Sequence, residues 1–122
     1  MGRFHSFEEI TAWQKARVLN LKLYTVSTSG LLSKDFVLRD QIRRASVSIS
    51  SNIAEGFERE TTKEFIRFLY IAKASAGELR SQLYLASDLN YITEEDFEKF
   101  KNDVTDISKL ISGLIKYLTS TL

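Results

Sequence analysis

Residues 61–86 read TTKEFIRFLYIAKASAGELRSQLYLA, a stretch in which apolar side chains recur at every third or fourth position. That spacing places about one apolar side chain per turn on a single face of an α-helix. Thr61, followed three residues later by Glu64, has the pattern of a capping box, which marks a helix start. The stretch therefore predicts a helix over residues 62–89 with a buried face made of Phe65, Leu69, Ala72, Ala76, Leu79, Leu83 and Ala86.

Two further helical patterns precede this one. The first predicts a helix over residues 7–28, because Ser6 and Glu9 form another capping-box pattern before an apolar face that includes Ile10, Trp13, Ala16 and Tyr24. Gly30 then supplies a break. The second pattern predicts a helix over residues 35–55, and Gly56 is expected to be the left-handed residue that ends it. Its apolar stripe consists of Leu38, Ile42, Ala45, Ile49 and Ile53.

A last pattern begins at Thr93, where three acidic residues follow at positions favoured by the helix dipole. It predicts a helix over residues 94–119 with an apolar stripe of Phe97, Phe100, Val104, Ile107, Ile111, Leu114 and Leu118. No strand alternation of useful length and no internal repeat is present. Four long helices with short connections predict an all-α fold, an up-down-up-down antiparallel four-helix bundle that forms a single domain over residues 1–122.

The composition excludes several classes of functional site. Because the chain has no Cys, thiolate catalysis and Cys-ligated metal sites are excluded. The single His, His5, precedes the first predicted helix, so the Glu-x-x-His pairs of a di-iron bundle cannot be built. Glycine-rich phosphate-binding loops are also absent. We therefore expect no catalytic residue, no cofactor and no metal ion.

The distribution of apolar residues along the sequence predicts where in the cell the protein is found. The longest apolar run, residues 68–72, has five residues, far fewer than the roughly 18 needed to span a bilayer. The start of the chain has acidic residues where a signal peptide would have an apolar stretch. We expect a cytoplasmic protein with no membrane partner.

Apolar or small side chains also lie on the faces opposite the predicted core stripes. On the helices predicted at 35–55 and 62–89, a helical wheel places seven of them there. A second face that is not typical of a solvated surface suggests self-association, although single exposed apolar residues are normal on any protein. The candidates for an oligomer interface are Phe36, Val47, Ala54, Ile66, Tyr70, Ala74 and Gly77.

Basic side chains on the same two helices are candidates for binding nucleic acid. The chain carries 17 basic and 16 acidic residues, so any attraction to phosphates must come from local patches. Residues 33–60, however, hold five basic and five acidic side chains, and a face engaged in its own ion pairs is the alternative. The candidate residues, which can contact phosphates if they lie together, are Arg39, Arg43, Arg44, Lys63 and Arg67.

One block of sequence resembles a known family. Residues 41–56, QIRRASVSISSNIAEG, are similar to the signature of the four-helix-bundle proteins encoded by intervening sequences in bacterial 23S rRNA genes. The segment from Glu64 to Leu79 is similar to a second block of that family, and Trp13 to Ala16 is similar to a first. The resemblance covers nearly the whole chain. Arg43, Arg44, Asn52, Glu55 and Gly56 match the signature, and Glu78 matches the second block.

The resemblance implies a non-enzymatic bundle that assembles as a ring-like homopentamer. The family is related to the accessory protein of diversity-generating retroelements, which is a basic pentamer that binds nucleic acid and a reverse transcriptase. We therefore expect a homo-oligomer that binds RNA, DNA or a ribonucleoprotein. The alternative is a protein-protein interaction scaffold whose arginines only hold the ring together, and the two differ in whether Arg39, Arg43, Lys63 and Arg67 stay unpaired.

The signature residues also have a purely structural interpretation. Gly56 can be required for its backbone angles. Asn52 and Glu55 can bond to loop amides or pair with Arg44 or Arg59. The sequence leaves these roles open.

Overall fold

The computed structural model describes residues 4–122, and within them the chain forms four long helices and no strand. The helices are α1 (Thr11–Val26), α2 (Phe36–Phe57), α3 (Thr62–Asp88) and α4 (Glu94–Ser120). Two short 3₁₀ turns, η1 (Phe7–Glu9) and η2 (Leu32–Lys34), precede α1 and α2. The predicted all-α class is confirmed, as are the helix starts at 62 and 94.

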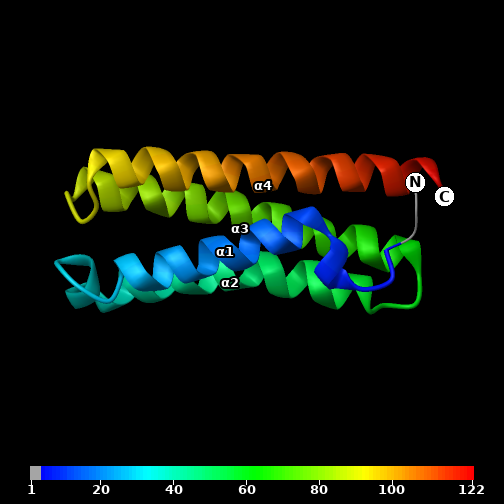
Figure 1. Ribbon diagram of the computed structural model, residues 1–122, viewed down its shortest axis with the longest axis horizontal. Coiled ribbons are helices and arrows are strands. Elements are labelled where there is room, and N and C mark those ends of the chain that lie inside the picture. The colour runs from blue at the N-terminus through cyan, green and yellow to red at the C-terminus, as the bar shows by residue number, and fades with distance from the viewer. Residues whose placement is uncertain (1–3) are drawn as a thin grey trace.

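The four helices form an up-down-up-down bundle. Figure 1 shows them side by side, with the chain direction reversing at each connection, so that the start of α1 and the end of α4 lie at the same end. Each helix packs against the next one along the chain, and α4 returns to α1. The α2–α3 pair has the most extensive packing, and the α1–α4 pair closes the bundle more loosely.

Side-chain caps fix the starts of three helices. The hydroxyls of Thr61 and Thr93 accept hydrogen bonds from backbone N–H groups three residues on, at 3.1 and 3.0 Å. Asp35 caps α2 in the same way, accepting from the Leu38 N–H at 3.1 Å. Its other carboxylate oxygen accepts from the Tyr91 hydroxyl at 3.0 Å, and this hydrogen bond raises the pKa of Tyr91. The bond ties the α3–α4 connection to the start of α2.

The prediction of one continuous first helix over residues 7–28 is wrong. The chain forms η1, becomes extended at Ile10 (φ −78°, ψ 118°), and only then enters α1. The Ser6 side chain caps nothing, and the Glu9 carboxylate accepts from the His5 N–H at 3.0 Å instead of completing a capping box. The extended residue places the Ile10 side chain in the core, where it is 2% exposed. Its burial accounts for the break.

The hydrophobic core lies between the four helices and consists of the predicted stripes. All residues predicted for the buried faces of α2 and α3 are buried. On α4, Leu114 and Leu118 are only half-buried at the edge of the core. On α1, Tyr24 is 41% exposed, so its assignment to the apolar core face is wrong. The buried face of α1 is narrower than predicted and consists of Ala12, Ala16, Leu19 and Leu23.

Gly56 does not end α2 as a left-handed residue. It lies inside the helix, and only Gly30 and Asn90 have positive φ among the described residues. A Cβ atom at Gly56 would meet the Phe68 Cβ at 2.6 Å and the Phe65 Cδ1 at 3.1 Å. The glycine is therefore required by the close approach of α3.

This contact makes a first prediction. Gly56→Ala is expected to lower the free energy of unfolding by about 1 to 3 kcal/mol, because the added methyl group has to displace the Phe68 Cβ. Gly113→Ala is the matched control, since a Cβ there meets nothing within 4 Å and alanine favours the helix by up to about 1 kcal/mol. Urea unfolding followed by circular dichroism measures both. Equal stability of the two variants would contradict the close-approach explanation.

Candidate binding surface of helices α1 and α2

An apolar surface runs along the outer side of the α1–α2 pair. We call it the α1–α2 face and define it by Trp13, Arg17, Leu21 and Tyr24 on α1 and by Arg43, Val47 and Ala54 on α2. Leu21 is 70% exposed and Val47 is 37% exposed. Asn20 accepts a hydrogen bond from Ser46 and donates one to Ser50, and the two bonds set the register of the helices and place Leu21 level with Val47.

Three arginines near this face stack on aromatic rings. The Arg17 guanidinium lies 5.8 Å from the centroid of Trp13, and that of Arg39 lies 4.8 Å from Phe36. Arg43 reaches from α2 to α1, where its guanidinium is 4.5 Å from the Tyr24 ring and its Nε donates to the buried Ser27 hydroxyl at 2.8 Å. These cation–π contacts hold positive charge beside exposed apolar surface. Tryptophan, tyrosine and arginine are the residues enriched at binding hot spots.

A half-buried polar network supports the α1–α2 face from below. The Ser46 hydroxyl donates to Asn20 Oδ1 at 2.6 Å, and Asn20 Nδ2 donates to the Ser50 hydroxyl at 3.0 Å. The Ser50 hydroxyl donates in turn to the Val47 carbonyl at 3.1 Å. Because Ser46 is 1% exposed, its hydroxyl has no solvent to replace Asn20 as a partner.

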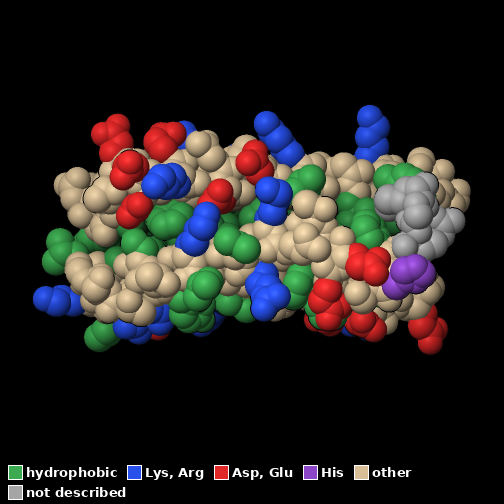
Figure 2. Space-filling view, viewed as in Figure 1, with side chains coloured by type: hydrophobic (Ala, Val, Ile, Leu, Met, Phe, Trp, Pro, Cys, Tyr) green, Lys and Arg blue, Asp and Glu red, His purple; other side chains and the backbone are tan. Residues whose placement is uncertain are grey.

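Charge is distributed unevenly along the chain. Residues 11–54, which make up α1 and most of α2, carry seven basic and only two acidic side chains. Figure 2 shows Lys and Arg side chains among hydrophobic ones over the left and middle of the lower half of the view, where most of α1 and α2 lie. Acidic side chains gather over the first part of α4 and, as a second group, at the right of the lower half. Sequence reasoning missed the contribution of Lys15, Arg17 and Lys22 on α1. A charge count by segment would have found it.

The structure separates the predicted nucleic-acid-binding residues. Arg39 pairs with Asp40 at 2.9 Å, so it is engaged within the chain. Arg43 is held by Ser27 and Tyr24, as described above, and has no acidic partner. The other three, Arg44, Lys63 and Arg67, are exposed and make no ion pair with any described residue.

The basic candidates also do not form one cluster. Gly56 packs on Phe68, so the start of α3 lies beside the end of α2. At about 1.5 Å per residue, Arg67 therefore lies about 19 Å and Lys63 about 25 Å along the bundle from Arg44. The expectation that all five lie together is wrong. The antiparallel packing of α2 and α3 places Arg44 level with the middle of α3, whereas Lys63 and Arg67 lie near its start.

The predicted interface residues fall on two surfaces. Phe36, Val47 and Ala54 lie on the α1 side of α2, and Phe36 is 64% exposed. On α3, Ala74 and Gly77 are exposed, and Tyr70 lines a groove with α4 residues. Ile66 is half-buried against the core, so it contributes to the fold as well.

The family-signature residues have mostly structural contacts. Asn52 Nδ2 donates to the carbonyl and the hydroxyl of Ser48, at 2.8 and 2.9 Å, and the Ser48 hydroxyl lies 2.9 Å from that of Ser75 on α3. Glu55 pairs with Arg59 at 3.1 Å. Glu78, by contrast, is exposed and accepts only a long hydrogen bond from Gln82, at 3.4 Å.

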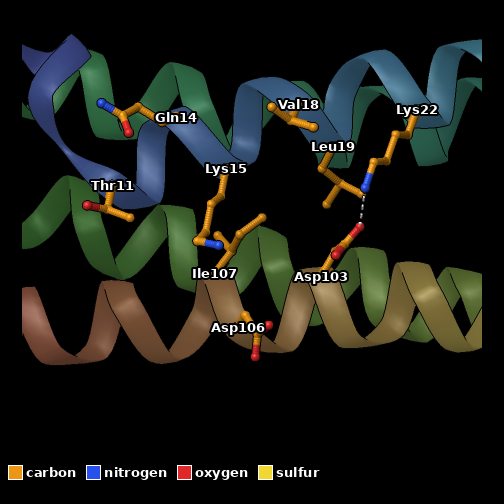
Figure 3. A pocket seen from close by; sticks show the side chains of 9 residues that line it. All are labelled: Thr11, Gln14, Lys15, Val18, Leu19, Lys22, Asp103, Asp106 and Ile107. Atoms are coloured by element: carbon orange, nitrogen blue, oxygen red, sulfur yellow. Dashed lines mark hydrogen bonds and ion pairs between the residues drawn. The ribbon is translucent and has the colours of Figure 1, made fainter.

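A groove also lies between α1 and α4. It measures about 360 Å³ and is lined by nine residues, shown in Figure 3. Lys22 and Asp103 point toward one another across it and form an ion pair at 3.2 Å, while Asp106 points away. Opposite charges that neutralise each other at an exposed seam make this groove a weak candidate for a ligand site.

Among residues 4–122, no three His, Cys, Asp or Glu side chains are grouped so that they could hold a metal ion. In that same part of the chain, no helix has the length and apolar character needed to cross a membrane.

Comparisons with known proteins agree on one family. The sequence profile described as "23S rRNA-intervening sequence protein" matches residues 8–113. The crystal structure of a protein of unknown function from the S23 ribosomal protein family of Bacteroides thetaiotaomicron superposes with a TM-score of 0.80 at 32% identity. That similarity covers 86% of this chain and 95% of the other. No curated protein sequence matches the chain. Neither description names an enzymatic activity.

The network beneath the α1–α2 face makes a second prediction. Asn20→Leu is expected to lower the free energy of unfolding by about 1 to 3 kcal/mol, because it leaves the buried Ser46 hydroxyl without an acceptor. Adding Ser46→Ala removes the orphaned hydroxyl and should recover part of the loss. Asn102→Leu, at an exposed position on α4, is the control. Denaturant unfolding of the wild type, the single variants Asn20→Leu and Ser46→Ala, and the double variant measures the coupling, and strictly additive effects would show that the two side chains act independently.

Proposed function

We propose, since the chain belongs to the 23S rRNA-intervening sequence protein family, that it is a non-enzymatic cytoplasmic bundle which self-associates and binds nucleic acid or ribonucleoprotein. The residue composition supports the proposed absence of catalysis. The chain has no Cys, and its one His is exposed before α1. No described group therefore combines a nucleophile with an imidazole base.

The observation that carries the nucleic-acid proposal is the state of Arg44, Lys63 and Arg67. All three are exposed, and none has an ion-pair partner among the described residues. Such side chains are free to contact phosphates, and arginine can do so bidentately. In an oligomer each of these charges is repeated in every copy, so a chain with a net charge of +1 can still present a strongly positive surface.

Self-association is supported by the α1–α2 face. Leu21 and Val47 are exposed at the same level of the bundle, and aromatic and arginine side chains flank them. An apolar patch with a polar rim is typical of a protein interface. The family resemblance makes five copies the expected number.

A protein-interaction scaffold without nucleic-acid binding is the second candidate. It is favoured by Arg39 and Arg43, which are engaged within the chain by Asp40, Ser27 and Tyr24. If the free basic side chains are only solvated surface, the interface between copies, which includes the α1–α2 face, is what remains as the functional surface.

Self-association gives a third prediction. Multi-angle light scattering at micromolar concentration should return about five times the chain mass of 14.0 kDa. Val47→Arg should reduce that mass, because it places a charge in the proposed apolar contact. Val37→Arg is the matched control on the same helix, where Val37 is 71% exposed on the side toward α3. A wild-type mass near that of one chain would refute self-association.

Nucleic-acid binding gives a fourth prediction. Fluorescence anisotropy with labelled single-stranded RNA and duplex DNA should show sequence-tolerant binding that weakens with salt, with a log–log slope of roughly −0.7 to −0.9 per phosphate neutralised. Arg44→Ala and Arg67→Ala should each make that slope shallower by about one per engaged subunit. Lys109→Ala, at an exposed position on α4, should not. Absence of binding at low salt, or equal slopes in all variants, would favour the scaffold.

A further inference from the structure

We infer that the α1–α2 face of one copy packs against the outer face of α3 in a second copy, so that the chain assembles head to tail. This inference rests on the self-association proposed above and assigns its two surfaces. It is carried by two exposed helical stripes of opposite charge on different helices.

The first stripe lies on the outer face of α3. It consists of six exposed residues whose spacing alternates between three and four, namely Ile71, Ala74, Glu78, Ser81, Leu85 and Asp88. Lys63 and Arg67 lie on the same face nearer the start of α3, so the acidic charge belongs to the C-terminal part of this face, at Glu78 and Asp88. That alternation is the spacing of a coiled-coil seam, in which one face of a helix meets a partner helix. No other part of the described chain covers this stripe, since Ile71 is 41% and Leu85 is 48% exposed. Small side chains at Ala74 and Ser81 allow a second helix to approach closely.

The second stripe has the same spacing on α1. It consists of Gln14, Arg17, Leu21 and Tyr24, all of them exposed. Val47 and Arg43 of α2 lie beside its C-terminal half, as the contact between Arg43 and Tyr24 shows. Leu21 is the most exposed apolar side chain of α1, at 70%. A partner helix laid along this stripe would cover Leu21 and Val47 together.

Charge determines which stripe meets which. Arg17 and Arg43 have no acidic partner, and Glu78 and Asp88 have no basic partner, among the described residues. Two copies joined through identical α1–α2 faces would bring four arginines together, which is unfavourable. An α1–α2 face against an α3 face instead brings arginines to carboxylates. Arg17 and Tyr24, the residue that Arg43 contacts, lie about 10 Å apart along α1, and Glu78 and Asp88 lie about 15 Å apart along α3, so the two pairs of charges have similar separations.

With these two surfaces the interface is heterologous, because the two copies contribute different faces to it. Each copy would use its α1–α2 face toward one neighbour and its α3 face toward the other, so repetition closes a ring or continues as a filament. It also gives Glu78, which has no strong contact within its own chain, a partner across the interface.

Charge reversal followed by mixing tests the assignment. One variant carries Arg17→Glu and Arg43→Glu, and the other carries Glu78→Arg and Asp88→Arg, so that no particular pairing has to be assumed. Each alone should have the mass of a single chain in light scattering, because its two stripes now repel. An equimolar mixture should assemble again into species heavier than a single chain, since each contact between unlike variants joins opposite charges. A ring of five cannot alternate throughout, so the mass of the mixture need not equal that of the wild type. Lys109→Glu with Lys116→Glu on α4 is the matched control and should stay assembled.

Cross-linking supplies a second measurement that does not depend on Arg43, whose replacement can weaken the fold. The chain has no Cys, so single cysteines report cleanly. Leu21→Cys and Ser81→Cys, each at the middle of its stripe, should be joined by a short bismaleimide when the two variants are mixed and should give no dimer when treated alone.

The results distinguish a failure of the proposed self-association from a failure of the assigned interface. A wild-type protein with the mass of one chain would overturn self-association and this assignment together. An assembled wild-type protein would overturn the assignment alone under any of three results. These are charge-reversed variants that stay assembled, folded variants whose mixture does not reassemble, and Leu21→Cys chains that cross-link to one another.

Discussion

The approach of α2 and α3 at Gly56 is the constraint on which the outer surface of the bundle depends. Since a Cβ there would lie 2.6 Å from the Phe68 Cβ, the two backbones are closer than any other residue would allow. That contact and the Ser48–Ser75 hydrogen bond fix the register of the α2–α3 pair. With the register fixed, helical geometry alone determines that Glu78 and Arg44 point outward and that Ala76 and Ile49 point inward.

The α1–α2 pair is fixed by polar contacts instead of a glycine. Asn20 bridges Ser46 and Ser50, and Arg43 reaches Ser27, so the middle of the pair and its end near the α1–α2 connection carry directional bonds. Hydrophobic burial is non-directional and would tolerate a slide of one helix along the other, whereas a satisfied polar network does so only at a cost. The network therefore explains why Leu21 and Val47 lie at one level, and with it the position of the apolar surface.

The sequence was sufficient for the bundle but not for the site. Periodicity and caps predicted α3 and α4 closely because Thr61, Thr93 and the apolar stripes act locally. Gly56 was misread because a glycine after an apolar stripe fits a helix end equally well, and only the position of Phe68 distinguishes the two. The pairing of the arginines was open for the same reason. Whether Arg43 meets an acid or a hydroxyl depends on α1, 16 residues away at Ser27.

Self-association and nucleic-acid binding are physically coupled in this protein. A strand that contacts Arg44, Lys63 and Arg67 spans about 25 Å on one copy, so a longer strand reaches the same residues on the next. Contacts to successive copies act as linked sites, which raises overall avidity without any new kind of contact. By mass action such a strand also stabilises the assembly that presents the sites. Salt screens both the phosphate contacts and the proposed ion pairs between copies. Because both weaken together, a salt slope measures phosphate contacts only while the assembled mass is constant.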